Sequence, residues 1–381
     1  MRIFYAVHDH SWEDSNLLEG LRQSGHDVDV YRPGHAFHEA LSPDWTPADR
    51  GRVSERLVDA VRSAQERRQI DVFFGYFLKQ LVYPQAIRDI RDLGILTLNY
   101  WCNGAHQFHL VDEISPAFDY CVATERSSLA SYQRVGAKPI YLQMAANPAI
   151  YRPYDLPLEF DVTFVGQRYA DRPEYVRYLL EAGIDVRVWG PGWTPDRTFG
   201  EKSLRAVNWR YLVRHPRTGS KRLLAAARSA LRKRVAMPPW AERRLSRAVG
   251  PSLPLEGLAR MYSRTRISLG FSTCGDAVYR DRHKIRQIHL RDFEAPMSGA
   301  LHLVEFQEEL REFYEIDQEI VCYASREELL DKVRFYLAHP AAAQRIREQG
   351  LGRARRDHTW VRRFDQLFSG LGLPTGSGGP R

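Results

Sequence analysis

The chain has 381 residues, enough for two domains with separate hydrophobic cores, and 44% of its residues are hydrophobic, as in globular proteins. No apolar run approaches the roughly 20 residues that span a bilayer. The chain opens on a strand rather than on a basic and apolar leader, so we expect no signal peptide. Its 4 cysteines lack Cys-x-x-Cys spacing, which argues against a zinc site or a disulfide framework and favours the cytoplasm.

The net charge of +8 is concentrated in one segment. Residues 196–249 contain 15 Lys and Arg against 3 Asp and Glu, which gives this segment a net charge of +12. The remainder of the chain is therefore slightly acidic, and we expect no nucleic-acid partner for the protein as a whole.

The first half alternates short apolar strands with helical patterns. Strands rich in β-branched and aromatic residues are predicted at Arg2–Val7, Asp27–Tyr31, Asp71–Phe77, Ile95–Tyr100, Phe118–Ala123 and Ile140–Met144. Helices are predicted between them, at Asp14–Ser24, Ala48–Arg68, Pro84–Leu93 and Ser127–Val135. This alternation is typical of a doubly wound parallel sheet.

A proline-rich link over residues 146–157 precedes a second alternating series. Strands are predicted at Asp161–Val165, Asp185–Trp189, Thr265–Gly270, Ala300–Val304 and Glu319–Tyr323. Helices are predicted at Pro173–Ala182, Leu255–Ser263, Arg326–Leu337, Ala341–Arg355 and Thr359–Leu367. The fold class is therefore α/β, with two Rossmann-like halves and a ligand site in the cleft between them.

The predicted domains follow from these two series. Residues 1–150 form the first Rossmann-like domain, and residues 158–355 form the second, with a basic helical insert at about 196–249. Residues 356–370 form a terminal helix, and residues 371–381 form a Gly/Ser/Pro-rich tail that we expect to be disordered.

The segment Arg291–Glu305, RDFEAPMSGALHLVE, carries the most specific chemical signal. It reads as a helix end with Arg291 and Glu294 on one face, followed by a Ser298-Gly299 stop and a strand. Pro296 should kink or end that helix. A carboxylate can accept both ribose hydroxyls and a guanidinium can bind a phosphate, so the pair suits a nucleotide. The alternative is an Arg–Glu pair on a solvated surface.

A cationic stretch precedes this motif. The segment Tyr279–Arg291, YRDRHKIRQIHLR, has five Lys and Arg residues against a single acidic residue, Asp281. Cations of this kind can stabilise the charge of a departing nucleoside diphosphate. The alternative is again a solvated basic face.

Four ordered segments between Asp161 and Leu367 resemble the carboxy-terminal half of GT-B glycosyltransferases, most closely the CgeB-like (spore-maturation type) group and the glycosyltransferase family 1-like carboxy-terminal domain. They begin DVTFVGQRYADRPEY, LEGLARMYSRTRISLGFS, RDFEAPMSGALHLVE and QEIVCYASREELL. The resemblance implies two Rossmann-like domains facing a central cleft, with the carboxy-terminal helices packing back toward the first domain. It also implies a metal-independent sugar transfer that needs no cofactor besides the nucleotide-sugar donor.

The resemblance also assigns roles to residues. Glu294 corresponds to the acidic residue that binds the donor ribose, Ser298 and Gly299 to the small pair after it, and Gly166 and Arg168 to a Gly-x-Arg turn at the diphosphate. We assign Lys284 and Arg291 to the diphosphate as well. Related retaining enzymes have a second Glu eight residues before the ribose carboxylate, where this chain has Arg286, so the resemblance does not fix the stereochemistry.

The acceptor side is predicted in the first domain. Transfer with inversion needs a general base, and His8, Asp9 and His10 follow the first strand, with His10 preferred and Asp9 as orienter or alternative base. These residues could instead be loop and N-cap residues. Trp101, Asn103 and His106 follow the fourth strand and could contact the acceptor, although an aromatic strand end can also be core.

The basic insert has three possible roles. Residues 220–235 form an amphipathic pattern with a basic face, typical of a helix on an anionic membrane surface. The same charge could bind a phosphorylated or nucleic-acid partner, or the insert could be a helical hairpin that packs on its own domain. The protein could therefore lie at the inner face of the membrane.

The sequence predicts a hexosyltransferase-type enzyme that moves a sugar from a nucleoside diphosphate-sugar to an acceptor hydroxyl on a glycan, a lipid-linked molecule or a small molecule. A nucleotide-sugar epimerase on the same fold is the alternative, followed by a non-catalytic sugar-nucleotide-binding protein. An NAD-dependent oxidoreductase is disfavoured because neither first strand is followed by Gly-x-Gly-x-x-Gly.

Overall fold

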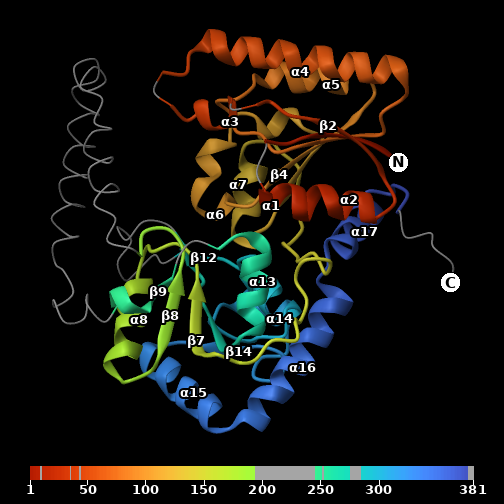
Figure 1. The fold of residues 1–381 in the computed structure, drawn as a ribbon. Coiled ribbons are helices and arrows are strands. Elements are labelled where there is room, and N and C mark those ends of the chain that lie inside the picture. The colour runs from red at the N-terminus through yellow and green to blue at the C-terminus, as the bar shows by residue number, and fades with distance from the viewer. Residues whose placement is uncertain are drawn as a thin grey trace, which may run out of the picture.

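The computed structural model describes residues 1–8, 11–34, 36–42, 44–193, 245–250, 253–274 and 285–375. This part of the chain contains two six-stranded parallel sheets, each packed between helices (Figure 1). The prediction of two Rossmann-like halves is therefore confirmed.

The first sheet has the order β2-β1-β3-β4-β5-β6. Its strands are β1 (Arg2–Ala6), β2 (Asp27–Tyr31), β3 (Val72–Gly75), β4 (Leu96–Trp101), β5 (Tyr120–Ala123) and β6 (Pro139–Tyr141). Its helices are α1 (Ser11–Glu13), a π-helix (Asp14–Leu18), α2 (Glu19–Gln23), α3 (Ala36–Glu39), α4 (Pro47–Arg67), α5 (Pro84–Arg91), α6 (Gly104–Gln107) and α7 (Leu129–Arg134). The central strands β3 and β4 are almost entirely buried because helices cover both faces of the sheet.

The second sheet has the order β14-β13-β10-β7-β8-β9. Its strands are β7 (Phe160–Val165), β8 (Val186–Trp189), β9 (Val249–Gly250), β10 (Thr265–Gly270), β13 (Leu301–Glu305) and β14 (Val321–Tyr323). Its helices are α8 (Arg172–Glu181), α13 (Leu255–Ser263), α14 (Arg291–Met297), α15 (Arg326–Ala338), α16 (Pro340–Asp357) and α17 (Trp360–Gly370). A separate two-stranded sheet, β11 (Thr273–Cys274) with β12 (Ile285–Arg286), was not predicted.

Strand order changes direction at one place in each sheet. In the first sheet the chain steps from β1 outward to β2 and then back to β3, and in the second it steps from β7 to β8 and β9 and then back to β10. Ligands of doubly wound folds bind at the carboxyl ends of the strands at such a reversal. The loops after β1 and β7 are therefore the places to look for a site.

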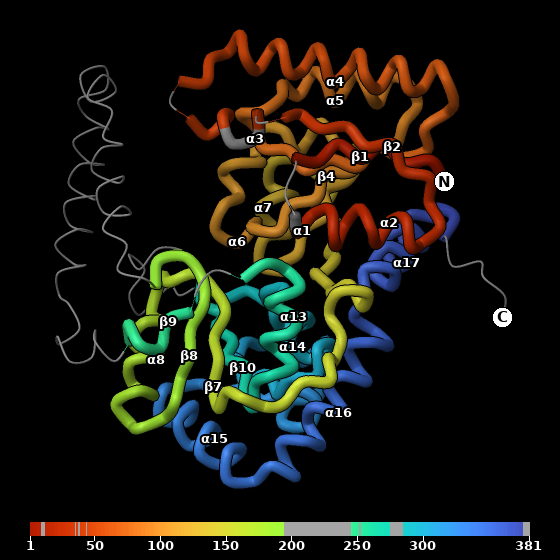
Figure 2. The backbone as a smooth tube through the Cα atoms, viewed as in Figure 1, coloured from red at the N-terminus to blue at the C-terminus, as the bar shows by residue number. Residues whose placement is uncertain are grey.

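Helix α17 returns from the second domain and packs on α2 of the first (Figure 2). Trp360 donates from Nε1 to Oδ1 of Asn16 over 2.8 Å, and both side chains are buried. Arg363 donates from Nε to the carbonyl oxygens of Gln143 and Met144 over 3.0 and 3.2 Å. The prediction that the carboxy-terminal helices pack back on the first domain is confirmed.

The prediction around Arg291 needs one correction. Arg291 is the first residue of α14, so the motif is a short helix of its own rather than the end of a longer one. Pro296 lies in its last turn, and the helix ends at Met297, one residue later. Gly299 then adopts a φ of 78°, which favours glycine and confirms the predicted stop.

We predict that Gly20→Ala destabilises the docking of α17. A Cβ at Gly20 would lie 2.6 Å from Cβ of Trp360, a contact that forces α2 and α17 apart. Overpacking of this kind costs about 1–3 kcal/mol. Urea unfolding measures the change in the free energy of unfolding.

Gly51→Ala in α4 is the matched control, because a Cβ there meets no atom within 4 Å. It should stabilise the protein by about 0.5–1 kcal/mol through helix propensity. Equal effects of the two substitutions would contradict the close packing of α17 on α2.

Candidate functional site

The loops after β7 and β8 are fastened to each other at two glycines. Gly190 has a φ of 132°, and a Cβ on it would lie 2.5 Å from the carbonyl oxygen of Gly166. The Gly166 amide donates to the Trp189 carbonyl over 2.7 Å, and Trp193 donates from Nε1 to the Gly166 carbonyl over 2.7 Å. At the predicted Gly-x-Arg turn, the backbone of Gly166 thus lies directly against the backbone of Gly190. Only glycine permits so close an approach.

Arg168 follows in the same turn. Its amide donates to the Pro191 carbonyl over 2.9 Å, and its guanidinium lies 5.9 Å from the centre of the Trp193 ring. Two residues later Ala170 has a φ of 51°, a left-handed conformation that costs energy in a non-glycine residue. Such backbone strain is common at functional sites, and this loop lies at the carboxyl end of the first strand of its sheet.

Arg172 is the cation that sequence reasoning missed. It begins α8, is only 3% exposed, and donates to the Gln167 carbonyl over 3.0 Å and to the Tyr169 hydroxyl over 2.6 Å. Its Nε atom is buried without a partner, and no carboxylate of the described residues lies within ion-pair distance. Burial lowers the pKa of Arg172 to about 10. A positive charge in the first turn of a helix is unfavourable next to the helix dipole. This exception was the signal in the sequence that could have identified Arg172.

Helix α14 brings Arg291 and Glu294 to the same region. Glu294 is 4% exposed, so the alternative of a solvated surface pair is wrong. Burial raises the pKa of Glu294, while Arg291 and the Tyr151 side chain act in the opposite direction. Ser298, which ends the helix, has a buried hydroxyl without a partner. The predicted residues Glu294, Arg291 and Ser298 therefore share one short element.

The start of α14 is fixed by a buried carboxylate. Asp292 accepts from the His289 amide over 2.8 Å, and its other oxygen lies 2.9 Å from Nε2 of His302 on β13. Burial lowers the pKa of His289 to about 3, so its ring is neutral at physiological pH. Its Nε2 atom is buried without a partner. Asp292 thus holds Arg291 in place through the backbone rather than by pairing with it.

The positive charges of Arg172 and Arg291 act on each other and on the same neighbouring groups. Each lowers the pKa of His289, and Arg291 contributes to the lowered pKa of Arg172. Two guanidinium groups that approach each other at low dielectric favour an anion between them. Arg172 in the first turn of α8 and Arg291 in the first turn of α14 are therefore a pair of interacting cations, and a guanidinium group can bind a phosphate.

Arg286 occupies the position where a retaining enzyme would have its second Glu. In the structure it lies on β12 and its Nε is 3.2 Å from Oε1 of Glu305. Glu305 is buried at the end of β13, and its Oε2 also accepts from the amide and hydroxyl of Thr273 over 3.1 and 2.9 Å. Glu305 was not predicted, because its partners are far apart in the sequence.

In the first domain, a histidine and a carboxylate meet after β1. Nε2 of His8 lies 3.0 Å from Oε1 of Glu13, and both residues are buried. The π-helix Asp14–Leu18 begins directly after Glu13, and π-helical turns are frequent at functional sites. A carboxylate that orients an imidazole is the arrangement of a general base. The predicted residues Asp9 and His10, like Lys284, lie outside the described residues.

The predicted acceptor residues differ in their burial and contacts. Trp101 is buried at the end of β4, where its ring packs 5.3 Å from that of Tyr76. Asn103 is half-buried and precedes α6. His106 reaches the second domain, with its Nδ1 3.7 Å from Sγ of Cys274.

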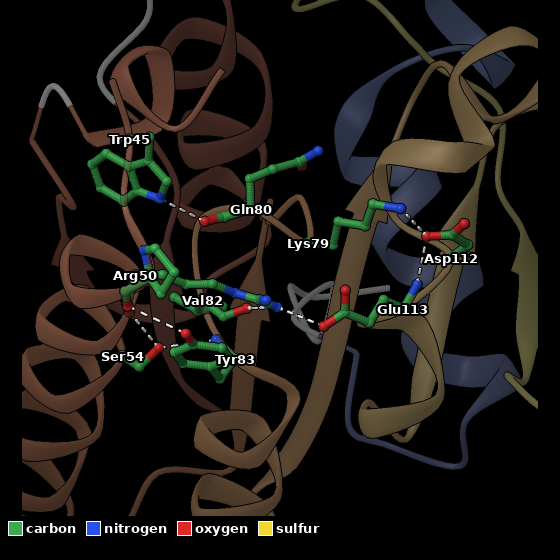
Figure 3. A network of polar contacts seen from close by, with 10 residues as sticks. Trp45, Arg50, Ser54, Lys79, Gln80, Val82, Tyr83, Asp112 and Glu113 are labelled. Carbon is green, nitrogen blue, oxygen red and sulfur yellow. Dashed lines mark hydrogen bonds and ion pairs between the residues drawn. The ribbon is translucent and has the colours of Figure 1, made fainter. Parts of the chain in front are cut away.

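The loops after β3 and β4 are joined by a polar network (Figure 3). Lys79 binds Asp112 over 2.9 Å, so the two loops are tied directly to each other. Arg50 of α4 donates to the Val82 carbonyl and to Glu113, both over 2.9 Å. These contacts hold the carboxyl-end loops of the first sheet in one arrangement.

Among the described residues, no group of three His, Cys, Asp or Glu side chains is arranged to hold a metal ion. No helix in the same ranges is long and apolar enough to cross a membrane.

Comparisons with known proteins agree with this geometry. Residues 214–369 match the family model described as glycosyl transferase-like. A search of curated proteins gave no match. Sucrose-phosphate synthase from Thermosynechococcus elongatus is 13% identical, with a TM-score of 0.58 over 98% of this chain and 99% of that chain.

Two further solved structures are similar over nearly their whole length. Anabaena HepE, solved with UDP and glucose, is 10% identical with a TM-score of 0.57, over 98% of this chain and 99% of HepE. A Listeria monocytogenes protein described as a UDP-N-acetylglucosamine 2-epimerase is 10% identical with a TM-score of 0.50, over 97% and 96% of the two chains. The chain therefore has the GT-B fold of glycosyltransferases, and its carboxy-terminal part is glycosyl transferase-like in sequence.

We predict that Arg172→Met weakens the binding of inorganic pyrophosphate roughly tenfold to a hundredfold, because one charge-assisted interaction is lost. Met removes a buried cation that forms no ion pair with any described carboxylate, so the fold should persist. The melting temperature, measured over a titration with pyrophosphate, reports the change in affinity.

Arg177→Met on the solvent side of α8 is the control. Equal pyrophosphate binding by the wild type and the two variants would exclude Arg172 from an anion site.

Proposed function

We propose that the protein is a hexosyltransferase that moves a sugar from a nucleoside diphosphate-sugar to an acceptor hydroxyl without a metal ion. The observation that carries the proposal is the pair Arg172 and Arg291, a buried and a half-buried cation that act on each other, together with the buried Glu294, on which Arg291 acts. A diphosphate and a ribose are the two groups that this combination suits.

The donor would lie across the first turns of α8 and α14. Glu294 would accept the ribose hydroxyls, and Arg172 and Arg291 would bind the diphosphate. Negative charge grows on the leaving diphosphate as the sugar–phosphate bond breaks, and fixed guanidinium groups stabilise it there. The side chains of Arg168 and Lys284 are the remaining predicted diphosphate contacts. Gly166, Ser298 and Gly299 are the remaining residues that the resemblance assigns to the donor site.

The acceptor would approach from the first domain. His8, oriented by Glu13, is the candidate base that the described residues support, because a carboxylate fixes the imidazole as an acceptor of the hydroxyl proton. Asp9 and His10 stay predictions from the sequence. Asn103 and His106 are the proposed acceptor contacts, and the acceptor itself is a glycan, a lipid-linked molecule or a small molecule.

The finer assignments also belong to this proposal. The CgeB-like subtype rests on the sequence resemblance. A cytoplasmic location with membrane contact through residues 196–249 rests on the positive charge of that segment. Residues 196–244 lie outside the described residues. A nucleotide-sugar epimerase is the second candidate, because one protein of this fold is described as such an enzyme.

Binding of nucleoside diphosphates tests the donor site. We expect one member of the set UDP, GDP, ADP and dTDP to stabilise the protein by roughly 2.7 kcal/mol at a hundred times its dissociation constant. The ribonucleotide should bind better than its 2′-deoxy form in the wild type, and this preference should vanish in Glu294→Gln. No stabilisation by any of them would contradict the proposal, and an unchanged ribose preference would remove Glu294 from the ribose site.

Turnover tests the base and separates transfer from epimerisation. His8→Gln should lower kcat by roughly a hundredfold or more and leave the dissociation constant of the donor nucleotide unchanged, because a general base acts in the transition state. Glu13→Gln should have a smaller effect of the same kind. If His8→Gln kept full turnover and His10→Ala lost activity, His10 rather than His8 would be the general base. Release of a rearranged nucleotide-sugar in place of free nucleoside diphosphate would favour the epimerase.

A further inference from the structure

A cavity of about 410 Å³ lies between the two domains, where α16 leads into α17 (Figure 1). The first domain lines it with residues 141–143 at the end of β6, and the second lines it mainly with residues of α16 and α17. None of Arg172, Arg291 and Glu294 lines this interdomain cavity, so it is separate from the proposed donor site. Its volume is that of a small-molecule site.

The interdomain cavity has a buried floor and an exposed rim. Gln143, His358 and Arg363 line the floor and are at most 3% exposed. Arg362 and Gln366, which lie four residues apart on α17, are exposed and line the rim. A ligand can therefore enter from solvent and reach buried groups, whose charges are screened by salt much less than charges at the surface.

Arg363 is a buried cation whose partners in the described chain are neutral. Besides the two carbonyl oxygens that its Nε contacts, it donates from Nη1 to the Asp357 carbonyl over 3.1 Å. Its Nη2 lies 3.3 Å from Nδ1 of His358. A guanidinium has five N–H groups, so one N–H on each Nη has no acceptor among the described residues. Burial lowers the pKa of Arg363 to about 10, so it is charged at neutral pH.

His358 adds no charge to the floor and accepts from Arg363. Its Nε2 lies 2.8 Å from the Phe313 carbonyl oxygen, which can only accept, so the ring proton is on Nε2 and Nδ1 is an acceptor. Burial lowers the pKa of His358 to about 3, which keeps the ring neutral. The positive charge of the floor is therefore that of Arg363.

The carboxylates that line the cavity are already paired with arginines. Glu312 accepts from Arg126 over 2.6 Å, and Asp357 lies 3.1 Å from Arg353. Arg362, in contrast, donates to a backbone carbonyl over 3.3 Å and forms no ion pair with a carboxylate of the described residues. Arg362 and Arg363 are thus two cations of the cavity whose charges are not balanced within the described chain.

Two unbalanced cations suit a ligand with two negative charges. A phosphate monoester carries a charge of about −1.5 to −2 at pH 7 and presents three acceptor oxygens. Guanidinium groups bind such oxygens through charge-assisted hydrogen bonds, and one N–H on each Nη of Arg363 is available for them. A carboxylate carries a single charge and would balance only one of the two cations.

We propose that the interdomain cavity is a second ligand site, in which Arg362 and Arg363 bind a phosphate dianion. The phosphate is either free or part of a small molecule, for which the volume leaves room. This site goes beyond the proposed sugar transfer and does not depend on the donor site.

Calorimetric titration of the full chain at pH 8 and constant ionic strength tests the site with glycerol 3-phosphate, inorganic phosphate and glycerate. Glycerol 3-phosphate should bind saturably and roughly tenfold or more tighter than glycerate, because it carries the second charge. Tighter binding of the ester than of inorganic phosphate would identify a phosphorylated small molecule as the ligand. Equal binding of the two would identify free phosphate.

Two variants at the exposed rim test the position of the site. Arg362→Gln should weaken glycerol 3-phosphate by roughly three- to tenfold, and Gln366→Glu should weaken it similarly through like charge. Arg363→Gln should weaken it by roughly tenfold or more, although it also removes contacts that hold α17. Arg355→Gln, at an exposed residue of α16 outside the cavity lining, is the control and should change nothing.

Three results would overturn the inference. They are the absence of saturable binding of either phosphate compound, equal binding of glycerate and glycerol 3-phosphate, and wild-type affinity in both Arg362→Gln and Gln366→Glu. Binding that is lost in Arg172→Met but kept in both rim variants would place the phosphate in the donor site instead. Failure of UDP and the other nucleoside diphosphates to bind would contradict the donor site and leave the interdomain cavity unaffected.

Discussion

The arrangement of the second domain depends on a buried cation that has no carboxylate partner among the described residues. A buried guanidinium is costly unless its charge is compensated. Arg172 is surrounded by neutral oxygens and by the rings of Tyr169, Phe164 and Phe271 instead. In the proposed function, a negative ligand would compensate this charge and recover the cost of burying it.

Several neighbouring features serve to keep this cation in place. The glycine contact between Gly166 and Gly190 fixes the turn that leads into α8, and Asp292 fixes the start of α14 from beneath. Neither contact involves the ligand. In the proposed function, this separation would let the diphosphate site form before the donor arrives, which is the condition for electrostatic stabilisation without reorganisation.

The two domains are joined by contacts of two kinds. Around α17 they are packed through buried aromatic side chains, with Trp360 against Asn16 of the first domain. Other contacts between the domains are polar, namely Arg126 with Glu312, Tyr141 with Glu309, and His106 with Cys274. The first two lie beside α17, because Tyr141 and Glu312 line the same cavity as Arg363.

The sequence predicted the regular elements and one part of the site. Strands such as β10 and helices such as α13 begin and end where apolar runs and helix stops place them. Glu294 could be found because its local motif carries the chemistry. Glu305 could not be found, since its significance depends on burial and on partners distant in the chain. Arg172 offered only the signal of a cation in a first helical turn, and its burial could not be read from the sequence. The small sheet of β11 and β12 was missed because two-residue strands have no periodicity.

A crystal structure of the protein with its best-binding nucleoside diphosphate tests the central claim most directly. The account predicts the ribose within hydrogen-bond distance of the Glu294 carboxylate and the two phosphates between Arg172 and Arg291. A nucleotide bound elsewhere, or one whose phosphates point away from both guanidinium groups, would contradict it.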